Sequence, residues 1–154
     1  MRPKAGDSAP DFHGLTTDGS EVKLGDFRGR KLVLYFYPMD FSPGCTAQAC
    51  SLRDHNGEIR AKGADILGVS TQNASSHQRF AKTYGLNFPL LADADRSVAR
   101  AYGAVGGSGV FAIAQALMGL ADRVTFVIDE QGTIAHVIDD PSCANHAEEV
   151  LARL

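Results

Sequence analysis

The sequence has few of the features that mark secreted, membrane or nucleic-acid-binding proteins. It contains no tryptophan and only three cysteines, and an odd, low cysteine count does not suit a disulfide scaffold. No apolar segment follows the N-terminal methionine, so we expect no secretory signal. The longest apolar stretch, residues 110–121, is too short to cross a bilayer. These absences predict a soluble, cytoplasmic protein with no membrane partner.

Charge of neither sign is in strong excess. The formal net charge is −3 at pH 7, and no basic stripe indicates nucleic acid as a partner. The 154 residues, 44% of them hydrophobic, suffice for one domain with a buried core. Because the chain contains no internal repeat, low-complexity tract or linker, we predict a single domain over residues 1–154.

Strand-like and helix-like patterns alternate along the chain. A turn at Asp18-Gly19 predicts an N-terminal β-hairpin over residues 12–16 and 21–24, and the apolar run 31–37 predicts a buried central strand. Further strands are expected at 64–70, 88–92, 123–129 and 133–138, and helices at 43–62, 75–84, 96–102 and 145–154. Ser75 with Gln78 suggests a capping box for the second helix, and Asn145 is expected to cap the last. This order predicts an α/β fold, thioredoxin-like in layout, with a central mixed sheet flanked by helices.

Cys45 comes directly after Pro43-Gly44, at the predicted start of the first helix. Backbone N–H groups in a first helical turn lack partners within the helix, and the helix dipole is positive there. Both features favour the thiolate, which is the nucleophilic form of cysteine. We therefore predict that Cys45 is a reactive thiol rather than a small buried apolar residue.

Cys50 lies in the same predicted helix, five residues after Cys45. In an intact helix their Cα atoms would be about 8.7 Å apart, whereas a disulfide needs Cα atoms within about 7 Å. If Cys50 pairs with an oxidised Cys45, the first turns of the helix must unwind. Cys143, before the last helix, has three interpretations: a bystander, which we favour, a backup thiol, or a site of intermolecular disulfides.

The segment 36–50 resembles the active-site segment of the peroxiredoxins, in particular the bacterioferritin comigratory protein or peroxiredoxin Q subfamily. The family pattern is Pro, three residues, Thr or Ser, two residues, Cys, and it is met by Pro38, Ser42 and Cys45. A second cysteine five residues later, here Cys50, marks the subfamily. Further similarity lies in the segments GDSAPDF (6–12), LRD (52–54), RVTFVID (123–129) and NH (145–146).

This resemblance implies a thioredoxin fold and a thiol-dependent peroxidase that reduces hydrogen peroxide and organic hydroperoxides without a metal or an organic cofactor. It implies that Cys45 attacks the peroxide to give a sulfenic acid, which Cys50 resolves as an intramolecular disulfide. Thioredoxin, or a similar dithiol protein such as a glutaredoxin-like reductant, would then reduce the disulfide. The family's tendency is a monomer, with a dimer left open.

Other residues of the motif suit this chemistry. The Ser42 hydroxyl can accept a hydrogen bond from the peroxide and donate one to the thiolate, and the Arg123 guanidinium can hold both reactants. Pro38 has no N–H and can cover the thiolate from water. Gln48 and Tyr37 are two further candidates for contact with the substrate.

Two features depart from the family. Ser42 stands where threonine is commoner, which keeps the hydroxyl but loses the methyl group that fixes its rotamer. Residues 106–121 match no family segment and could form a hydrophobic lid or a dimer face.

Three rival functions each have some support in the sequence. A zinc site would take its ligands from Cys45, Cys50, Cys143 and His146. The spacing of the first two is wrong for a zinc knuckle. A thioredoxin-type disulfide oxidoreductase would use Cys-x-x-Cys, with two intervening residues rather than four. A redox-regulated binding module has only the apolar residues 110–121 in its favour.

Overall fold

The computed structural model describes residues 2–105 and 118–154. Within these residues the centre is a five-stranded sheet with the order β5-β4-β3-β6-β7. Its strands are β3 (Lys31–Phe36), β4 (Ala64–Ser70), β5 (Leu90–Ala92), β6 (Val124–Ile128) and β7 (Ile134–Ile138). The sheet is mixed, because β3 runs parallel to β4 and antiparallel to β6.

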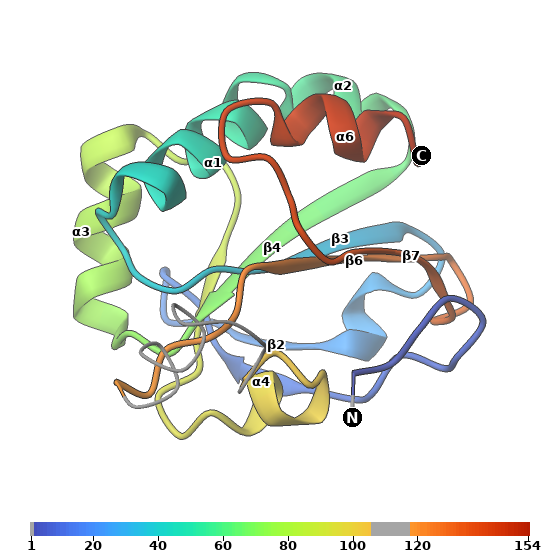
Figure 1. Cartoon of the computed structure of the whole chain (residues 1–154), viewed down its shortest axis with the longest axis horizontal. Helices are drawn as coiled ribbons and strands as arrows, with labels where there is room; N and C mark the ends of the chain where they lie inside the picture. The colour runs from blue at the N-terminus through green and yellow to red at the C-terminus, as the bar shows by residue number, and fades with distance from the viewer. Residues whose placement is uncertain (1, 106–117) are drawn as a thin grey trace.

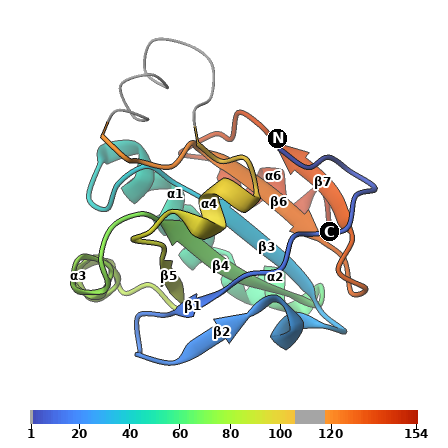
Figure 2. The same ribbon diagram turned by 90° about the horizontal axis from the view of Figure 1, so that it is seen from below.

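Helices cover both faces of this sheet (Figure 1). One face carries α1 (Pro43–Asp54), α2 (Asn56–Ala61), α3 (Ala74–Tyr84) and α6 (His146–Leu151). The other face carries α4 (Ser97–Ala101), the 3-10 helix η1 (Leu24–Phe27) and the hairpin of β1 (His13–Leu15) and β2 (Glu21–Lys23). Figure 2 shows α4 and the hairpin in front of the sheet, with α1, α2 and α6 behind it.

The central strand β3 divides the core into two layers. Leu32 and Leu34 pack on the side of α4 and the hairpin, whereas Val33 and Tyr35 face α1, α3 and α6. Successive side chains of a strand point to opposite faces, so one apolar run can fill both layers. Cys45 belongs to the layer of Val33 and Tyr35. The candidate site is therefore built between the sheet and α1.

The structure confirms the predicted α/β class, the mixed sheet and the N-terminal hairpin. The two hairpin strands pair antiparallel, with Gly14 opposite Val22. The predicted strands are all present, and their ends are up to two residues shorter than expected. The sequence pattern therefore located the strands well, because their apolar periodicity is local and strong.

The single helix predicted over residues 43–62 is wrong, because it divides into α1 and α2 at His55. That residue has φ −111° and ψ 8°, which is not helical geometry. Its Nδ1 lies 2.9 Å from the Ser51 carbonyl oxygen, the acceptor that its own N–H would use in an unbroken helix. The His55 N–H bonds instead to the Leu52 carbonyl at 3.3 Å. The histidine side chain thus replaces a backbone donor and ends α1.

The capping box expected from Ser75 and Gln78 is also wrong. The N-cap of α3 is Asn73, whose side-chain oxygen accepts a hydrogen bond from the Ser76 N–H at 2.8 Å. Asparagine is among the preferred residues at this position, and it competes with the serine two residues later. The predicted end at Gly85 is confirmed, with φ +58°.

The start of α6 differs from expectation in one detail. Asn145 stands at the N-cap, but its side chain makes no capping bond. Its N–H donates to Ser142 Oγ at 3.1 Å, and the Ser142 N–H donates to Glu149 Oε1 at 2.7 Å. These bonds fix the segment before α6, and in place of the expected cap Ser51 Oγ on α1 accepts a bond from the Ala147 N–H at 3.1 Å.

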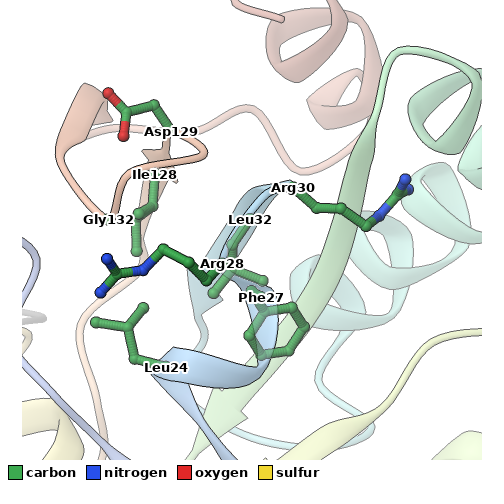
Figure 3. A pocket seen from close by; sticks show the side chains of 8 residues that line it. All are labelled: Leu24, Phe27, Arg28, Arg30, Leu32, Ile128, Asp129 and Gly132. Carbon is green, nitrogen blue, oxygen red and sulfur yellow. The ribbon is translucent and has the colours of Figure 1, made fainter.

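A small hollow lies at one end of the sheet (Figure 3). Its lining comes from η1, the start of β3 and the turn between β6 and β7, namely Leu24, Phe27, Arg28, Arg30, Leu32, Ile128, Asp129 and Gly132. Since β3 begins here and ends beside α1, the length of the strand separates this hollow from Cys45.

Among the described residues, no helix is long and apolar enough to pass through a membrane. The lid or dimer face expected at 106–121 falls mainly on residues 106–117, which lie outside the described residues.

Candidate active site

Cys45 occupies the first turn of α1, as predicted. Ser42 is the N-cap and Pro43 is the first helical residue, where its fixed φ and missing N–H are tolerated. The Ser42 Oγ accepts a hydrogen bond from the Cys45 N–H at 3.3 Å. Cys45 is 1% exposed. The thiol therefore lies at the positive end of the helix dipole and is largely shielded from water.

Arg123 reaches Cys45 from the residue just before β6. Its Nη2 donates to Cys45 Sγ at 3.2 Å, and its Nη1 donates to Gln48 Oε1 at 2.7 Å. Gln48 lies one turn after Cys45 on α1 and is fully buried. The pairing of Phe36 with Val124 brings the start of β6 beside the end of β3, and so beside α1. Two bonds orient the planar guanidinium, which presents fixed donors at the sulfur.

A buried polar network holds the loop between β3 and α1. Asp40 Oδ1 accepts from the Tyr37 hydroxyl at 2.7 Å, and Oδ2 accepts from the Ser76 hydroxyl at 2.7 Å. His77 Nδ1 lies 2.8 Å from Oδ2, and His77 Nε2 lies 3.1 Å from the Leu91 carbonyl oxygen. The side chains of Asp40 and His77 are fully buried.

This network determines the charge state of Asp40. Burial raises the pKa of the Asp40 carboxyl, but hydrogen bonds from His77, Ser76 and Tyr37 outweigh it and hold the pKa below its ordinary value. Sequence reasoning missed both Asp40 and His77. Asp40 lies within the recognised segment, but nothing local indicates that its partner is 37 residues away.

The neighbouring Phe41 also docks on α3. Its ring centroid lies 5.2 Å from that of Phe80 and 6.2 Å from that of Tyr84. Phe41 has φ +67°, a left-handed conformation that is uncommon for a residue with a large side chain. The loop that precedes Cys45 is thus fixed to α3 by one polar and one aromatic anchor.

Two other predicted residues lie close by in the fold. Tyr37, a candidate for substrate contact, is buried and directs its hydroxyl to Asp40. Burial raises its pKa well above the ordinary value. Pro38, the second residue after β3, is buried at the entry to the same loop.

Comparison with known proteins identifies the family. A family model described as the AhpC/TSA family matches residues 5–137, most of the chain. The chain belongs to the AhpC/TSA family. Peroxiredoxin Bcp of Escherichia coli (strain K12) is 44% identical over 152 residues, which cover 98% of this chain and 96% of that protein. The predicted resemblance to peroxiredoxins is confirmed. The present chain is thus itself a peroxiredoxin and a thiol-dependent peroxidase.

Solved structures of relatives agree with this peroxiredoxin in fold. The crystal structure of peroxidoxin BcpB from Mycobacterium tuberculosis matches with a TM-score of 0.83 and 32% identity, covering 97% of this chain and 95% of that one. The Xanthomonas campestris bacterioferritin comigratory protein matches with a TM-score of 0.82 and 30% identity, covering 96% and 95%. The predicted thioredoxin-like fold is therefore confirmed.

The three cysteines of the peroxiredoxin are free thiols in this structure. Cys50 is half-buried within α1, which runs unbroken from Pro43 past it. Cys143 is half-buried before α6 and lies unexpectedly close to the first turn of α1. A methyl group on Gly44 would be 3.1 Å from Cys143 Sγ and 3.2 Å from Arg123 Nη2. Spacing along the chain carried no signal for this proximity.

The four candidate zinc ligands are not gathered. In residues 2–105 and 118–154, which include all four, no group of three or more His, Cys, Asp or Glu side chains could hold a metal ion. His146 Nε2 lies 2.9 Å from Thr125 Oγ1 and its Nδ1 lies 3.0 Å from Glu149 Oε1. Burial lowers the pKa of His146. Its contacts join α6 to β6 rather than to a cysteine.

Proposed function

We propose that this peroxiredoxin reduces hydroperoxides by direct attack of the Cys45 thiolate. The single observation that carries the proposal is the bond of Arg123 Nη2 to Cys45 Sγ at 3.2 Å. A guanidinium at this distance stabilises the thiolate and lies where charge develops on the peroxide oxygens. The sulfur forms a bond to one oxygen while the O–O bond breaks. The other oxygen leaves with the electron pair and takes a proton to become water or an alcohol.

The other site residues have supporting roles in this proposal. The Ser42 oxygen caps α1 through the Cys45 N–H, and its own proton remains available for donation to the peroxide or the thiolate. Gln48 orients Arg123 through the 2.7 Å bond. Its Nε2 has no hydrogen-bond partner among the described residues and can serve a substrate oxygen. Pro38 shields the thiolate because it offers no competing N–H.

Both hydrogen peroxide and organic hydroperoxides are proposed substrates. The comigratory protein of Xanthomonas campestris is described in terms of alkyl peroxide reduction activity, which supports the organic class. Direct attack on the O–O bond needs only one oxygen of the substrate, so the chemistry is the same whatever group the other oxygen bears.

Resolution of the sulfenic acid falls to Cys50 in this proposal. The intact α1 keeps the two Cα atoms about 8.7 Å apart, so its first turns must unwind before the Cys45–Cys50 disulfide forms. Thioredoxin or a glutaredoxin-like dithiol protein then reduces the disulfide. We propose that this occurs in the cytoplasm, because each cycle consumes reducing equivalents that such a compartment supplies.

The proposed working unit is a monomer of one domain. Cys45, Arg123, Gln48 and Cys50 all come from one chain, so no second copy is needed to complete the site. A dimer remains compatible with this arrangement.

Peroxide consumption by the wild type, Cys45→Ser and Cys50→Ser, with thioredoxin as reductant, tests the proposal. We expect Cys45→Ser to be inactive. Cys50→Ser should consume one equivalent of peroxide and then fail to turn over efficiently. An insulin-reduction assay on the same samples tests the rival disulfide oxidoreductase. Full peroxidase activity of Cys45→Ser would overturn the assignment.

A further inference from the structure

We propose that Cys143 is a second resolving thiol, which captures the oxidised Cys45 while α1 stays folded. The inference rests on the proposed function, because it needs a sulfenic acid at Cys45. It goes further by giving a role to the third cysteine, which the sequence alone favoured as a bystander.

The geometry around Gly44 supports this role. Arg123 Nη2 and Cys143 Sγ both lie within 3.2 Å of the point where a Gly44 side chain would begin. The same Nη2 donates to Cys45 Sγ at 3.2 Å. Cys143 therefore packs against Gly44, the residue next to Cys45, on the side from which Arg123 reaches the attacking sulfur. Because position 44 is glycine, no side chain at that position stands between Cys143 and the first turn of α1.

The backbone around Cys143 differs from the backbone around Cys50. Residues 139–145, which include Cys143, form neither helix nor strand. Cys50, in contrast, lies in the same continuous helix as Cys45, five residues later. The residue before Cys143 fixes this segment to α6, because the Ser142 N–H donates to Glu149 Oε1 at 2.7 Å. A local shift of an irregular segment costs fewer backbone hydrogen bonds than unwinding of helical turns. Cys143 can thus approach Cys45 without the conformational change that Cys50 requires.

The proposed step is balanced. The Cys143 sulfur attacks the sulfur of the Cys45 sulfenic acid, an S–S bond forms, and the S–O bond breaks. The hydroxide that leaves takes the proton released by the Cys143 thiol, so the products are one disulfide and one water. No further oxidant is required, and two electrons from a dithiol reductant restore both thiols.

The two resolving thiols produce different disulfides. The Cys45–Cys50 disulfide lies in an unwound segment that a reductant can reach. A Cys45–Cys143 disulfide forms on a folded site where Cys45 is 1% exposed. A protein reductant must then attack the half-buried Cys143 sulfur, and we expect slow reduction. In Cys50→Ser, the Cys45–Cys143 disulfide should therefore protect Cys45 from further oxidation. Its slow reduction should keep the peroxidase turnover of this variant low.

Peptide mapping under non-reducing conditions tests the inference on three variants after one equivalent of hydrogen peroxide. They are Cys50→Ser, Cys50→Ser with Cys143→Ser, and that double variant with Ala144→Cys as a matched control. Ala144 is exposed, so Ala144→Cys offers a thiol one residue further along on the solvent side of the segment. Trapping with a 1,3-dione probe measures the lifetime of the sulfenic acid in each variant.

We expect an intramolecular Cys45–Cys143 disulfide in Cys50→Ser, because a thiol held against the first turn of α1 acts at high effective concentration. The sulfenic acid should persist at least about tenfold longer in the double variant and in its Ala144→Cys derivative. Equal lifetimes in all three, a covalent dimer through Cys143, or equally fast capture by Ala144→Cys would overturn the inference alone. An unoxidised Cys45 in every variant would overturn the proposed function with it.

Discussion

The first turn of α1 and its later turns are held in different ways. In the first turn, the capping bond from Ser42 to the Cys45 N–H is 3.3 Å long, and Pro43 is exposed. In the later turns, Leu52 is fully buried, and the Ser51 hydroxyl accepts a 3.1 Å bond from the N–H of Ala147 on α6. In the proposed opening, the start of the helix gives up the Arg123 bonds to Cys45 and Gln48, while its later turns stay packed against α6 and the sheet.

The anchor of Asp40 on α3 limits the opening from the other side. The segment proposed to rearrange thus lies between two anchors, Asp40 and Ser51, and it contains Cys45 and Cys50. Substitutions in the first turn should alter the reaction rate with peroxide and the opening of the helix. Substitutions at the two anchors should alter the free energy of unfolding.

Arg123→Ala should have the largest effect, because it removes the charged donor from the first turn. We expect the rate constant with peroxide to fall by about 10²–10³, as for loss of a donor that stabilises developing charge. Arg123→Lys keeps the charge but not the two-pronged geometry, and should fall between Arg123→Ala and the wild type. Stopped-flow measurement of Cys45 oxidation checks the order. Equal rates in the wild type and Arg123→Ala would show that the 3.2 Å contact has no catalytic value.

Asp40→Asn should weaken the first anchor. The amide cannot accept all three hydrogen bonds of the carboxylate, so a buried donor loses its partner. The free energy of unfolding should therefore fall by about 1–3 kcal/mol. Urea denaturation measures this loss. The exposed Asp54 on α1 provides a matched control, and Asp54→Asn should change stability little.

The stability of the wild type should also depend on pH through Asp40. Its folded pKa is depressed below the ordinary value of 3.8, so its contribution to stability is fully present above that value. The contribution is lost as pH falls through the lower, folded pKa. Asp40→Asn should flatten this acid limb of the stability curve, measured by urea denaturation from neutral to acid pH. An unchanged acid limb would exclude Asp40 as its source.

Ser51→Ala should loosen the second anchor. The buried Ala147 N–H loses its acceptor, which costs about 1–3 kcal/mol at most. Hydrogen exchange should then be faster in the later turns of α1 and the first turn of α6, while Cys45 keeps its reaction rate with peroxide. Acceleration confined to the first turn of α1 would contradict the division drawn between the two ends.

The smallest effects on stability are expected at Ser42. Ser42→Ala removes the cap and should destabilise α1 by about 0.5–2 kcal/mol. Ser42→Thr keeps the hydroxyl and adds a methyl group that restricts its rotamer, so we expect a slightly tighter first turn. Amide hydrogen exchange at residues 43–46 compares the three proteins. A looser first turn in Ser42→Thr than in the wild type would contradict the rotamer argument.

The comparison also separates what the sequence predicts from what it does not. The site of Cys45 at a helix start follows from Pro43-Gly44 after an apolar run, since these signals are local. The partners of Asp40, the bond of Gln48 to Arg123 and the approach of Cys143 to Gly44 join distant segments. They depend on how helices are laid on the sheet, for which one sequence contains no periodic signal. The break at His55 was missed because a side chain there competes with the backbone.

Phe41 introduces conformational strain into the loop before Cys45. A non-glycine residue in the left-handed region costs on the order of 1–3 kcal/mol, and Phe41 adopts φ +67°. Its ring contacts with Phe80 and Tyr84 offset this cost, because aromatic pairs contribute about 0.5–1.5 kcal/mol each. When the segment opens, strain and contacts are released together and nearly cancel. Release of Phe41 from α3 should therefore add little to the free energy that the proposed opening around Cys45 costs.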